Sequence, residues 1–174
     1  MKELILGGVR SGKSRLAEQR AQESGLAVVY VATATPGDEE MRRRIEEHRK
    51  QRHARWLTIE EPRALAQVVR EHAGTDRCVL IECLTLWLTN LLCATQGPRE
   101  LEAERTALLT VVQEVPGHLI IVSNETGLGI VPIDALSRRF SEEAGLLHQD
   151  LARICDRVTF VAAGLPLTLK GGLC

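Results

Sequence analysis

Residues 7–14 read Gly7-Gly8-Val9-Arg10-Ser11-Gly12-Lys13-Ser14, and this stretch decides the fold class. It matches the pattern G-x-x-x-x-G-K-[ST], in which glycines let the backbone wrap a phosphate with successive N–H groups facing the anion. The apolar run 4–6 before it predicts a strand, and residues 13–24 after it predict a helix. A glycine-rich turn with a chance Lys-Ser is the alternative, but the position between strand and helix favours a P-loop.

The P-loop assigns roles to two side chains. Lys13 is expected to reach the β- and γ-phosphates of a nucleoside triphosphate, and Ser14 Oγ to bind Mg²⁺. We therefore predict that all eight residues quoted above contact nucleotide and that Lys13 is also catalytic.

Short apolar runs alternate with helical stretches along the rest of the chain. The runs 27–32, 78–81, 118–123 and 157–162 are continuous rather than alternating, which is typical of parallel strands buried on both faces. Helices are expected at residues 38–51, 62–73, 84–95, 98–114 and 133–156. This alternation predicts a mainly parallel α/β sheet with helices on both faces. With the P-loop motif included, we predict a P-loop NTPase fold of the RecA-like class. Residues 165–169 predict an antiparallel C-terminal edge strand.

Length and composition limit the other possibilities. A chain of 174 residues with 44% hydrophobic residues is expected to form a single domain, 1–174. The net charge of −1 and the aromatic content of 3% argue against nucleic-acid binding by charge or by base stacking. No apolar run approaches the ~18 residues that span a bilayer. The five Cys form no C-x-x-C pair, which favours a reducing, cytoplasmic compartment over a disulfide framework.

Polar residues follow two of the expected strands. Glu82 ends the third expected strand, where a P-loop fold places the acid that holds the metal, although an ordinary acid at a strand end is the alternative. Thr33, Ala34 and Thr35 follow the second strand at the same carboxyl edge, where open α/β sheets bind ligands. These three residues alone favour a plain polar loop.

The segment 42–55 is strongly basic. It contains seven Lys and Arg residues against two Glu, a local charge of about +5. A solvated helix with acidic residues at its start and basic residues at its end explains part of this pattern. Met41, Ile45 and His48 fall on one helical face, so His48 is expected to point inward amid arginines.

Two roles stay open for His48 from the residues alone. A lone His on an apolar face is more often a buried core residue than a catalyst. A neutral imidazole, with a reference pKa of about 6.5, is nonetheless a competent nucleophile toward the α-phosphorus of a triphosphate. His53 competes for the same catalytic role.

The motifs together resemble the bifunctional adenosylcobinamide kinase/adenosylcobinamide-phosphate guanylyltransferase family over nearly the whole chain. They are the P-loop, Tyr30-Val31-Ala32-Thr33-Ala34, Asp38-x-Glu40-Met41, Arg44-Ile45-x-x-His48, Trp56-x-Thr58-x-Glu60, Glu82-Cys83-Leu84-Thr85, Thr89-Asn90-Leu91-Leu92 and Asn124-Glu125-x-Gly127-x-Gly129-Ile130-Val131-Pro132. The sequence departs from the family pattern at Arg52-His53, Ser141 and His148-Gln149. These departures bear on how the corrinoid substrate is bound, and not on the nucleotide site.

The resemblance implies two successive reactions. ATP or GTP phosphorylates adenosylcobinamide, and GTP then donates GMP to adenosylcobinamide phosphate through a guanylyl-histidine that matches His48. It implies nucleotide binding by the P-loop, Thr33, Ala34, Thr35, Arg49, Lys50, Gln51, Glu60 and Glu82, with Mg²⁺ on Ser14 and Glu82, and it suggests a homotrimer. One alternative is a single-activity small-molecule kinase with the basic helix as a phosphate-clamping lid. Another is a nucleotide-regulated module that grips nucleic acid or a partner through residues 42–55.

Overall fold

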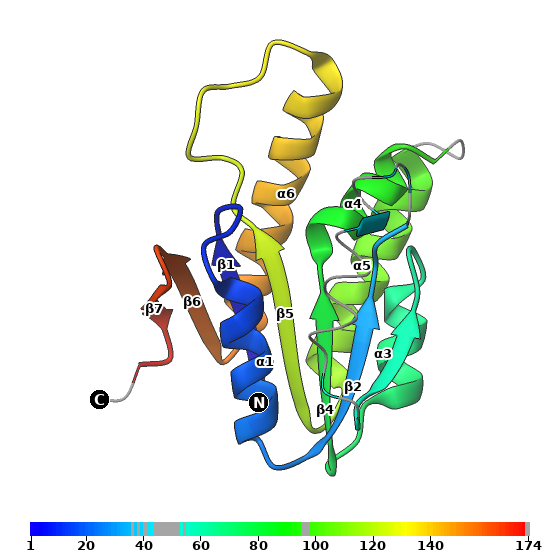
Figure 1. Ribbon diagram of the computed structural model, residues 1–174. Coiled ribbons are helices and arrows are strands. Elements are labelled where there is room, and N and C mark those ends of the chain that lie inside the picture. The colour runs from blue at the N-terminus through cyan, green and yellow to red at the C-terminus, as the bar shows by residue number, and fades with distance from the viewer. Residues whose placement is uncertain are drawn as a thin grey trace.

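The computed structural model describes residues 1–35, 37, 39, 42–43, 53, 55–94 and 98–172. Within this part of the chain, one sheet has the strand order β3-β2-β4-β5-β1-β6-β7 (Figure 1). The strands are β1 (Lys2–Gly7), β2 (Ala27–Ala32), β3 (Leu57–Glu60), β4 (Arg77–Glu82), β5 (His118–Asn124), β6 (Arg157–Ala162) and β7 (Leu165–Lys170). Neighbouring strands are parallel except β6 and β7. The mainly parallel sheet with an antiparallel C-terminal edge is therefore confirmed.

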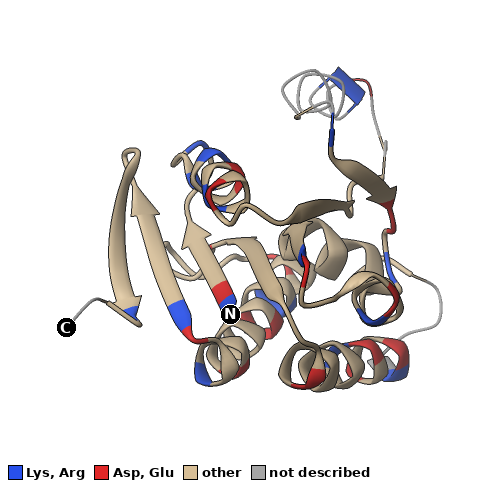
Figure 2. Cartoon of the chain, turned by 90° about the horizontal axis from the view of Figure 1, so that it is seen from below, with Lys and Arg blue, Asp and Glu red and all other residues tan. Residues whose placement is uncertain are grey.

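Helices cover both faces of this sheet, as predicted (Figure 2). They are α1 (Lys13–Glu23), α3 (Leu65–His72), α4 (Leu84–Leu92), α5 (Pro98–Glu114) and α6 (Ala135–Ile154). Ala17 and Ala21 of α1 pack with one set of strand residues, including Ile120. The buried residues of α3, α4, α5 and α6 pack with the alternate set, including Ile121. Because side chains alternate along a strand, residues two positions apart on one strand face the same helical layer.

A buried ion pair fixes α1 against the sheet. Arg20 of α1 pairs with Glu3, which is fully buried on β1. Arg20 also donates to Thr159 Oγ1 of β6 over 3.0 Å, so three elements meet at this cluster. The orientation of α1, and with it the P-loop, is thereby set from its C-terminal half.

The sequence did not predict strand β3 (Leu57–Glu60). Strand β3 is four residues long, mostly exposed, and lies at the edge of the sheet beside β2. Such a short and exposed edge strand has no continuous apolar run, which is the pattern that identified the others. Glu82 therefore ends the fourth strand of the chain and not the third.

Some helix boundaries also differ from the expected ones. The helix predicted from residue 62 begins at Leu65, because Trp87 Nε1 and Asn90 Nδ2 occupy the carbonyl oxygens of Arg63 and Pro62. Helix α6 begins at Ala135, since Asp134 Oδ1 accepts from Ser137 N over 2.8 Å as a cap. The predicted helix 38–51 falls almost wholly outside the described residues.

No helix within the described ranges is both long enough and apolar enough to cross a membrane.

Candidate active site

The P-loop joins the end of β1 to the start of α1, as the motif predicts. Gly12 caps α1 with a φ of +100°, which is the left-handed region that favours glycine. Its N-terminal neighbour Ser11 accepts a hydrogen bond at its carbonyl oxygen from Gly164 N over 2.8 Å. At Gly7 a Cβ would lie 2.5 Å from both Ser11 Oγ and Val161 O, so no side chain fits there. The turn between β6 and β7 thus packs against the loop and supports its conformation.

Lys13 lies inside this loop. The residue is only 7% exposed, and its Nζ donates to Gly8 O over 3.0 Å. Burial lowers the pKa of Lys13, while the nearby carboxylate of Glu82 works in the opposite direction. Ser11 Oγ is buried and has no hydrogen-bond partner within the described residues. An ammonium and an unsatisfied hydroxyl at a helix N-terminus suit a phosphate group.

Glu82 and Ser14 come together although 68 residues separate them. Ser14 Oγ donates to Glu82 Oε1 over 2.8 Å, which links the first turn of α1 to the end of β4. Both are hard oxygen ligands of the kind that Mg²⁺ prefers, and Mg²⁺ commonly completes its coordination with phosphate oxygens and water. No group of three or more His, Cys, Asp or Glu that could hold a metal occurs among the described residues. The pair therefore fits Mg²⁺ that arrives with a nucleotide.

Thr33 uses its polar groups on the protein itself. Its Oγ1 donates to Cys83 O over 2.7 Å and accepts from Cys83 N over 2.9 Å. Its backbone N–H donates to Glu82 O over 3.1 Å. Thr33 thus ties the end of β2 to the residue that follows β4, and it positions Glu82.

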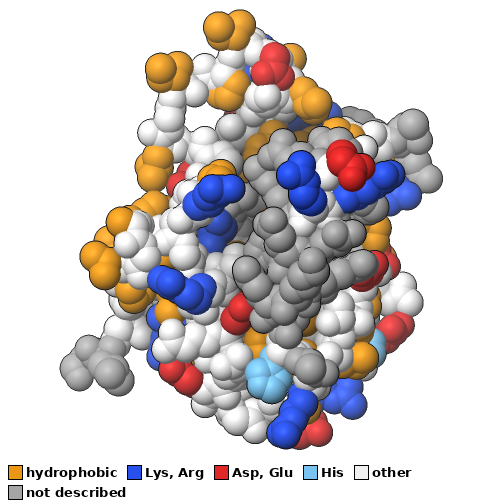
Figure 3. Space-filling view, viewed as in Figure 1, with side chains coloured by type: hydrophobic (Ala, Val, Ile, Leu, Met, Phe, Trp, Pro, Cys, Tyr) orange, Lys and Arg blue, Asp and Glu red, His pale blue; other side chains and the backbone are white. Residues whose placement is uncertain are grey.

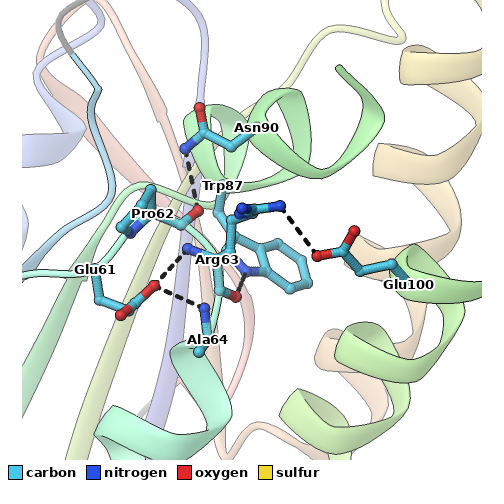
Figure 4. A network of polar contacts seen from close by, with 7 residues as sticks. All are labelled: Glu61, Pro62, Arg63, Ala64, Trp87, Asn90 and Glu100. Atoms are coloured by element: carbon cyan, nitrogen blue, oxygen red, sulfur yellow. Dashed lines mark hydrogen bonds and ion pairs between the residues drawn. The ribbon is translucent and has the colours of Figure 1, made fainter. Parts of the chain in front are cut away.

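Asn90 holds the loop that continues from Thr33. Its Nδ2 donates to Thr33 O over 2.8 Å and to Pro62 O over 3.1 Å, and its Oδ1 accepts from Thr35 Oγ1 over 2.9 Å. Figure 4 shows Asn90 pointing from α4 toward Pro62, while the indole of Trp87 lies beside Arg63. Glu61 Oε1 accepts from the N–H groups of Arg63 and Ala64, which closes the turn before α3 (Figure 4). The side-chain amide of Asn90 therefore connects the loop after β2 with the loop after β3.

Glu60 ends β3 at the same carboxyl edge but far from the P-loop. Four strand steps separate β3 from β1 in the sheet, which at ~4.8 Å per step is about 19 Å. Glu60 is exposed. It is therefore too far from Lys13 to bind the same phosphate, and could only meet another part of an extended ligand.

A second polar cluster lies at the carboxyl end of β5. Glu125 N donates to Gly7 O over 3.0 Å, so the cluster begins beside the first P-loop residue. His148 on α6 is 7% exposed, and its Nε2 lies 2.8 Å from Ser123 Oγ. Its Nδ1 lies 3.7 Å from Glu125 Oε2. Burial lowers the pKa of His148, and Glu125 opposes that effect.

Known proteins that are similar to this chain identify its family. Residues 3–169 match the family described as "Cobinamide kinase / cobinamide phosphate guanyltransferase". The chain belongs to this family. Among its relatives, it is 61% identical over 171 residues to the bifunctional adenosylcobalamin biosynthesis protein CobP of Pseudomonas aeruginosa, covering 98% of each chain. It is 36% identical to the bifunctional adenosylcobalamin biosynthesis protein CobU of Escherichia coli, covering 96% of this chain and 98% of that one.

Solved structures resemble this cobinamide kinase / guanyltransferase family member in fold alone. The flagellar accessory protein FlaH of Methanocaldococcus jannaschii matches with a TM-score of 0.50 and 14% identity, covering 97% of this chain and 77% of FlaH. An ATPase from a type III secretion system matches with a TM-score of 0.51 and 10% identity, covering 96% and 57%. With β5 lying between β1 and β4, the sheet confirms the predicted P-loop NTPase fold of the RecA-like class.

Four of the residues predicted for the site lie outside the described part of this family member. They are His48, Arg49, Lys50 and Gln51. His53, the competing histidine, is exposed, and its ring lies 6.1 Å from the ring of Trp56, which in turn stacks with Tyr30. The structure therefore gives His53 a place on the α1 side of the sheet, near β2.

Sequence reasoning gave no role to Asn90, His148 or Ser123. Asn90 carried one usable signal, since it is an amide within the helix Leu84–Leu92, whose other residues are Leu, Trp and Thr. Ser123 sits within an apolar strand and His148 within an amphipathic helix, 25 residues apart. No local spacing could have predicted that these two meet.

Proposed function

We propose that this chain carries out both reactions of its family. It phosphorylates the hydroxyl of adenosylcobinamide with ATP or GTP. It then transfers GMP from GTP to adenosylcobinamide phosphate, giving adenosylcobinamide-GDP and pyrophosphate. The observation that carries this proposal is the Ser14–Glu82 contact beside the buried Lys13, in a chain that aligns with 98% of a bifunctional relative.

In the kinase step, the residues around the P-loop bind and orient the triphosphate. The backbone of residues 7–12 and the N-terminus of α1 receive the phosphates, and Lys13 neutralises charge on the β- and γ-groups. Ser14 and Glu82 would hold Mg²⁺, which neutralises charge on the phosphate oxygens when bound. Burial of Lys13 strengthens its interaction with the transferred group, because water competes less there.

In the guanylyl step, we assign the nucleophile to His48. A neutral ring nitrogen attacks the α-phosphorus of GTP, the bond from that phosphorus to the β-phosphate oxygen breaks, and pyrophosphate leaves. A phosphate oxygen of the acceptor then attacks the same phosphorus and releases the histidine. Arg49, Lys50 and Gln51 would bind the triphosphate during this transfer. The support for these four roles is the family motif that the sequence carries.

We assign the nucleoside end of GTP to the far end of the sheet edge. Thr35 and Ala34 follow β2, and Glu60 ends β3 about 19 Å from β1. A carboxylate accepts hydrogen bonds from N–H groups of guanine, which adenine does not present in that pattern. Glu60 would therefore favour GTP over ATP in the second reaction.

The deciding experiment is covalent labelling with GTP labelled at the α-phosphorus in the presence of Mg²⁺. Wild-type protein should carry acid-labile, base-stable label, and His48→Ala should carry none while still phosphorylating adenosylcobinamide. His53→Ala is the matched control and should be labelled like the wild type. An active kinase without label would support the single-activity kinase instead. Salt-dependent binding of nucleic acid without either activity would support the binding module.

We further propose that the enzyme works in the cytoplasm as a homotrimer. Four cysteines of the described residues are free thiols, as expected in a reducing compartment. Leu165, Leu167 and Leu169 are 58–72% exposed on edge strand β7, which offers an apolar surface to another subunit. We propose no nucleic-acid partner.

A further inference from the structure

Two carboxylates stand at the carboxyl edge of the sheet, and they face opposite helical layers. On β4, Leu80 packs with α1, so Glu82, two residues later, shares its side of the sheet and meets Ser14 of α1. On β5, Ile121 packs with the opposite layer, so Ser123 and Glu125 face α6. The P-loop therefore has a carboxylate on each side of the strand ends.

Glu125 is held in one place. Its N–H donates to Gly7 O over 3.0 Å, which continues the pairing of β5 with β1 beyond the strand. Its Oε1 accepts from Gly127 N over 2.5 Å. Its Oε2 faces His148 Nδ1 at 3.7 Å, and the side chain keeps 22% exposure. The carboxylate is thus fixed beside the phosphate loop and still open to a ligand.

His148 supports Glu125 from α6. Its Nε2 lies 2.8 Å from Ser123 Oγ, while its Nδ1 is buried without a hydrogen-bond partner within the described residues. When the serine hydroxyl donates to Nε2, the ring proton sits on Nδ1 and points at the carboxylate. Burial keeps this ring neutral by lowering its pKa. A neutral His orients the carboxylate without cancelling its charge.

The loop that follows Glu125 carries exposed apolar side chains. Leu128 is 80%, Ile130 97% and Val131 72% exposed in the loop between β5 and α6. Figure 3 shows hydrophobic side chains gathered along this loop, which projects beyond the ends of the strands. A carboxylate repels phosphate but accepts from O–H and N–H donors. A carboxylate next to such an apolar loop suits a large ligand with hydrocarbon surface and amide or hydroxyl donors.

We propose that Glu125 binds the acceptor substrate through such a donor, and that His148 is the positioning residue that holds Glu125. The acceptor meant is the corrinoid of the proposed function, on which this inference rests. The nucleotide then lies on the α1 side of the strand ends and the acceptor on the α6 side, with the P-loop between them.

The test measures the kinase reaction with corrinoid and nucleotide varied separately, and measures direct binding of cobinamide. Glu125→Gln should raise the KM and the Kd for the corrinoid at least about tenfold, because a charged acceptor is lost. The KM for the nucleotide should stay within about twofold. Glu142→Gln, the same change on the exposed face of α6, is the matched control and should match the wild type.

The positioning role of His148 has its own readout. His148→Leu should raise the corrinoid KM about fivefold and leave the nucleotide KM unchanged. His148→Asn should restore most of the wild-type value, because its amide supplies an N–H toward Glu125. If His148 had only a structural role, the corrinoid KM of each variant would instead rise in step with its loss of unfolding temperature.

Three results would overturn the proposal. An active Glu125→Gln enzyme with unchanged corrinoid KM and Kd removes Glu125 from the acceptor site. An equal rise in the nucleotide KM assigns Glu125 to the nucleotide site. A wild-type protein that binds nucleotide but neither binds nor phosphorylates cobinamide overturns the proposed function together with this inference, and so differs from the first two.

Discussion

At the scale of single residues, Lys13 shows that burying a charge costs solvation free energy and strengthens ligand binding. The fold buries this ammonium to 7% exposure, and burial lowers its pKa because the charged form loses water. Gly8 O and the nearby Glu82 compensate in part. A charge held in this way is poorly solvated and therefore interacts strongly with a phosphate.

We predict that Lys13→Met reduces kcat/KM of both reactions about 100-fold or more, as removal of one charged contact to a transferring group does. The free energy of unfolding should stay within about 1 kcal/mol of wild type, because the lost contacts and the removed cost of burying a charge offset each other. Activity assays and urea unfolding check this. Lys2→Met at the opposite edge of the sheet is the control and should keep activity; a large loss of stability in Lys13→Met would contradict the prediction.

At the scale of elements, the P-loop depends on the hairpin of β6 and β7. Gly164 N donates to Ser11 O, and a Cβ on Gly12 would approach Gly164 Cα to 3.3 Å. Gly12 also has a φ of +100°. The conformation of the phosphate loop is thus supported by residues about 150 positions later in the chain.

We predict that Gly12→Ala lowers the free energy of unfolding by about 1–2 kcal/mol, because an L side chain is strained at this φ. It should also weaken nucleotide binding, since the loop must shift to relieve the contact with Gly164. Denaturant unfolding and nucleotide titration measure the two effects. Gly8→Ala is the matched control for the stability measurement, because nothing lies within 4 Å of its Cβ position and its φ is outside the left-handed region. Equal stability of the two variants would show that the hairpin contact has no energetic weight.

At the scale of the whole molecule, the buried His148 and the half-buried His118 link stability to pH. His148 and His118 both have a pKa lowered chiefly by burial. The unfolded chain, with a His pKa of about 6.5, therefore binds protons before the folded chain does as the pH falls. The stability that depends on these two neutral rings is fully present above a pH of about 6.5, and it is lost as the pH falls from there toward the folded pKa of each ring.

We predict that wild-type protein loses more unfolding free energy between pH 7.5 and pH 5.5 than His148→Asn does. The Asn variant removes one of the two rings whose pKa is lowered and leaves the other. Urea unfolding at the two pH values measures the difference. His53→Asn, a change at an exposed ring, should lose as much as the wild type. A wild-type-like loss in His148→Asn would mean that His148 does not resist protonation in the fold.

The sequence by itself determined the features that depend on neighbours in the chain. Continuous apolar runs predicted the buried strands, and the glycines before Lys13 predicted the turn from β1 into α1. These patterns are local, since a strand buried on both faces and a helix that begins at a phosphate loop each leave their mark within about ten residues. The family motifs likewise indicate the enzyme class without reference to any long-range contact.

Only the tertiary structure decided which distant residues meet. The strand order places Glu82 beside Ser14, and it places β5, with Ser123, between β4 and β1. It also admits the exposed strand β3, which pairs with β2 through backbone hydrogen bonds that leave little trace in side-chain pattern. The contact of His148 with Ser123 depends on how α6 packs on the sheet. Such contacts follow from long-range pairing and packing, which the spacing of residues along the chain does not encode.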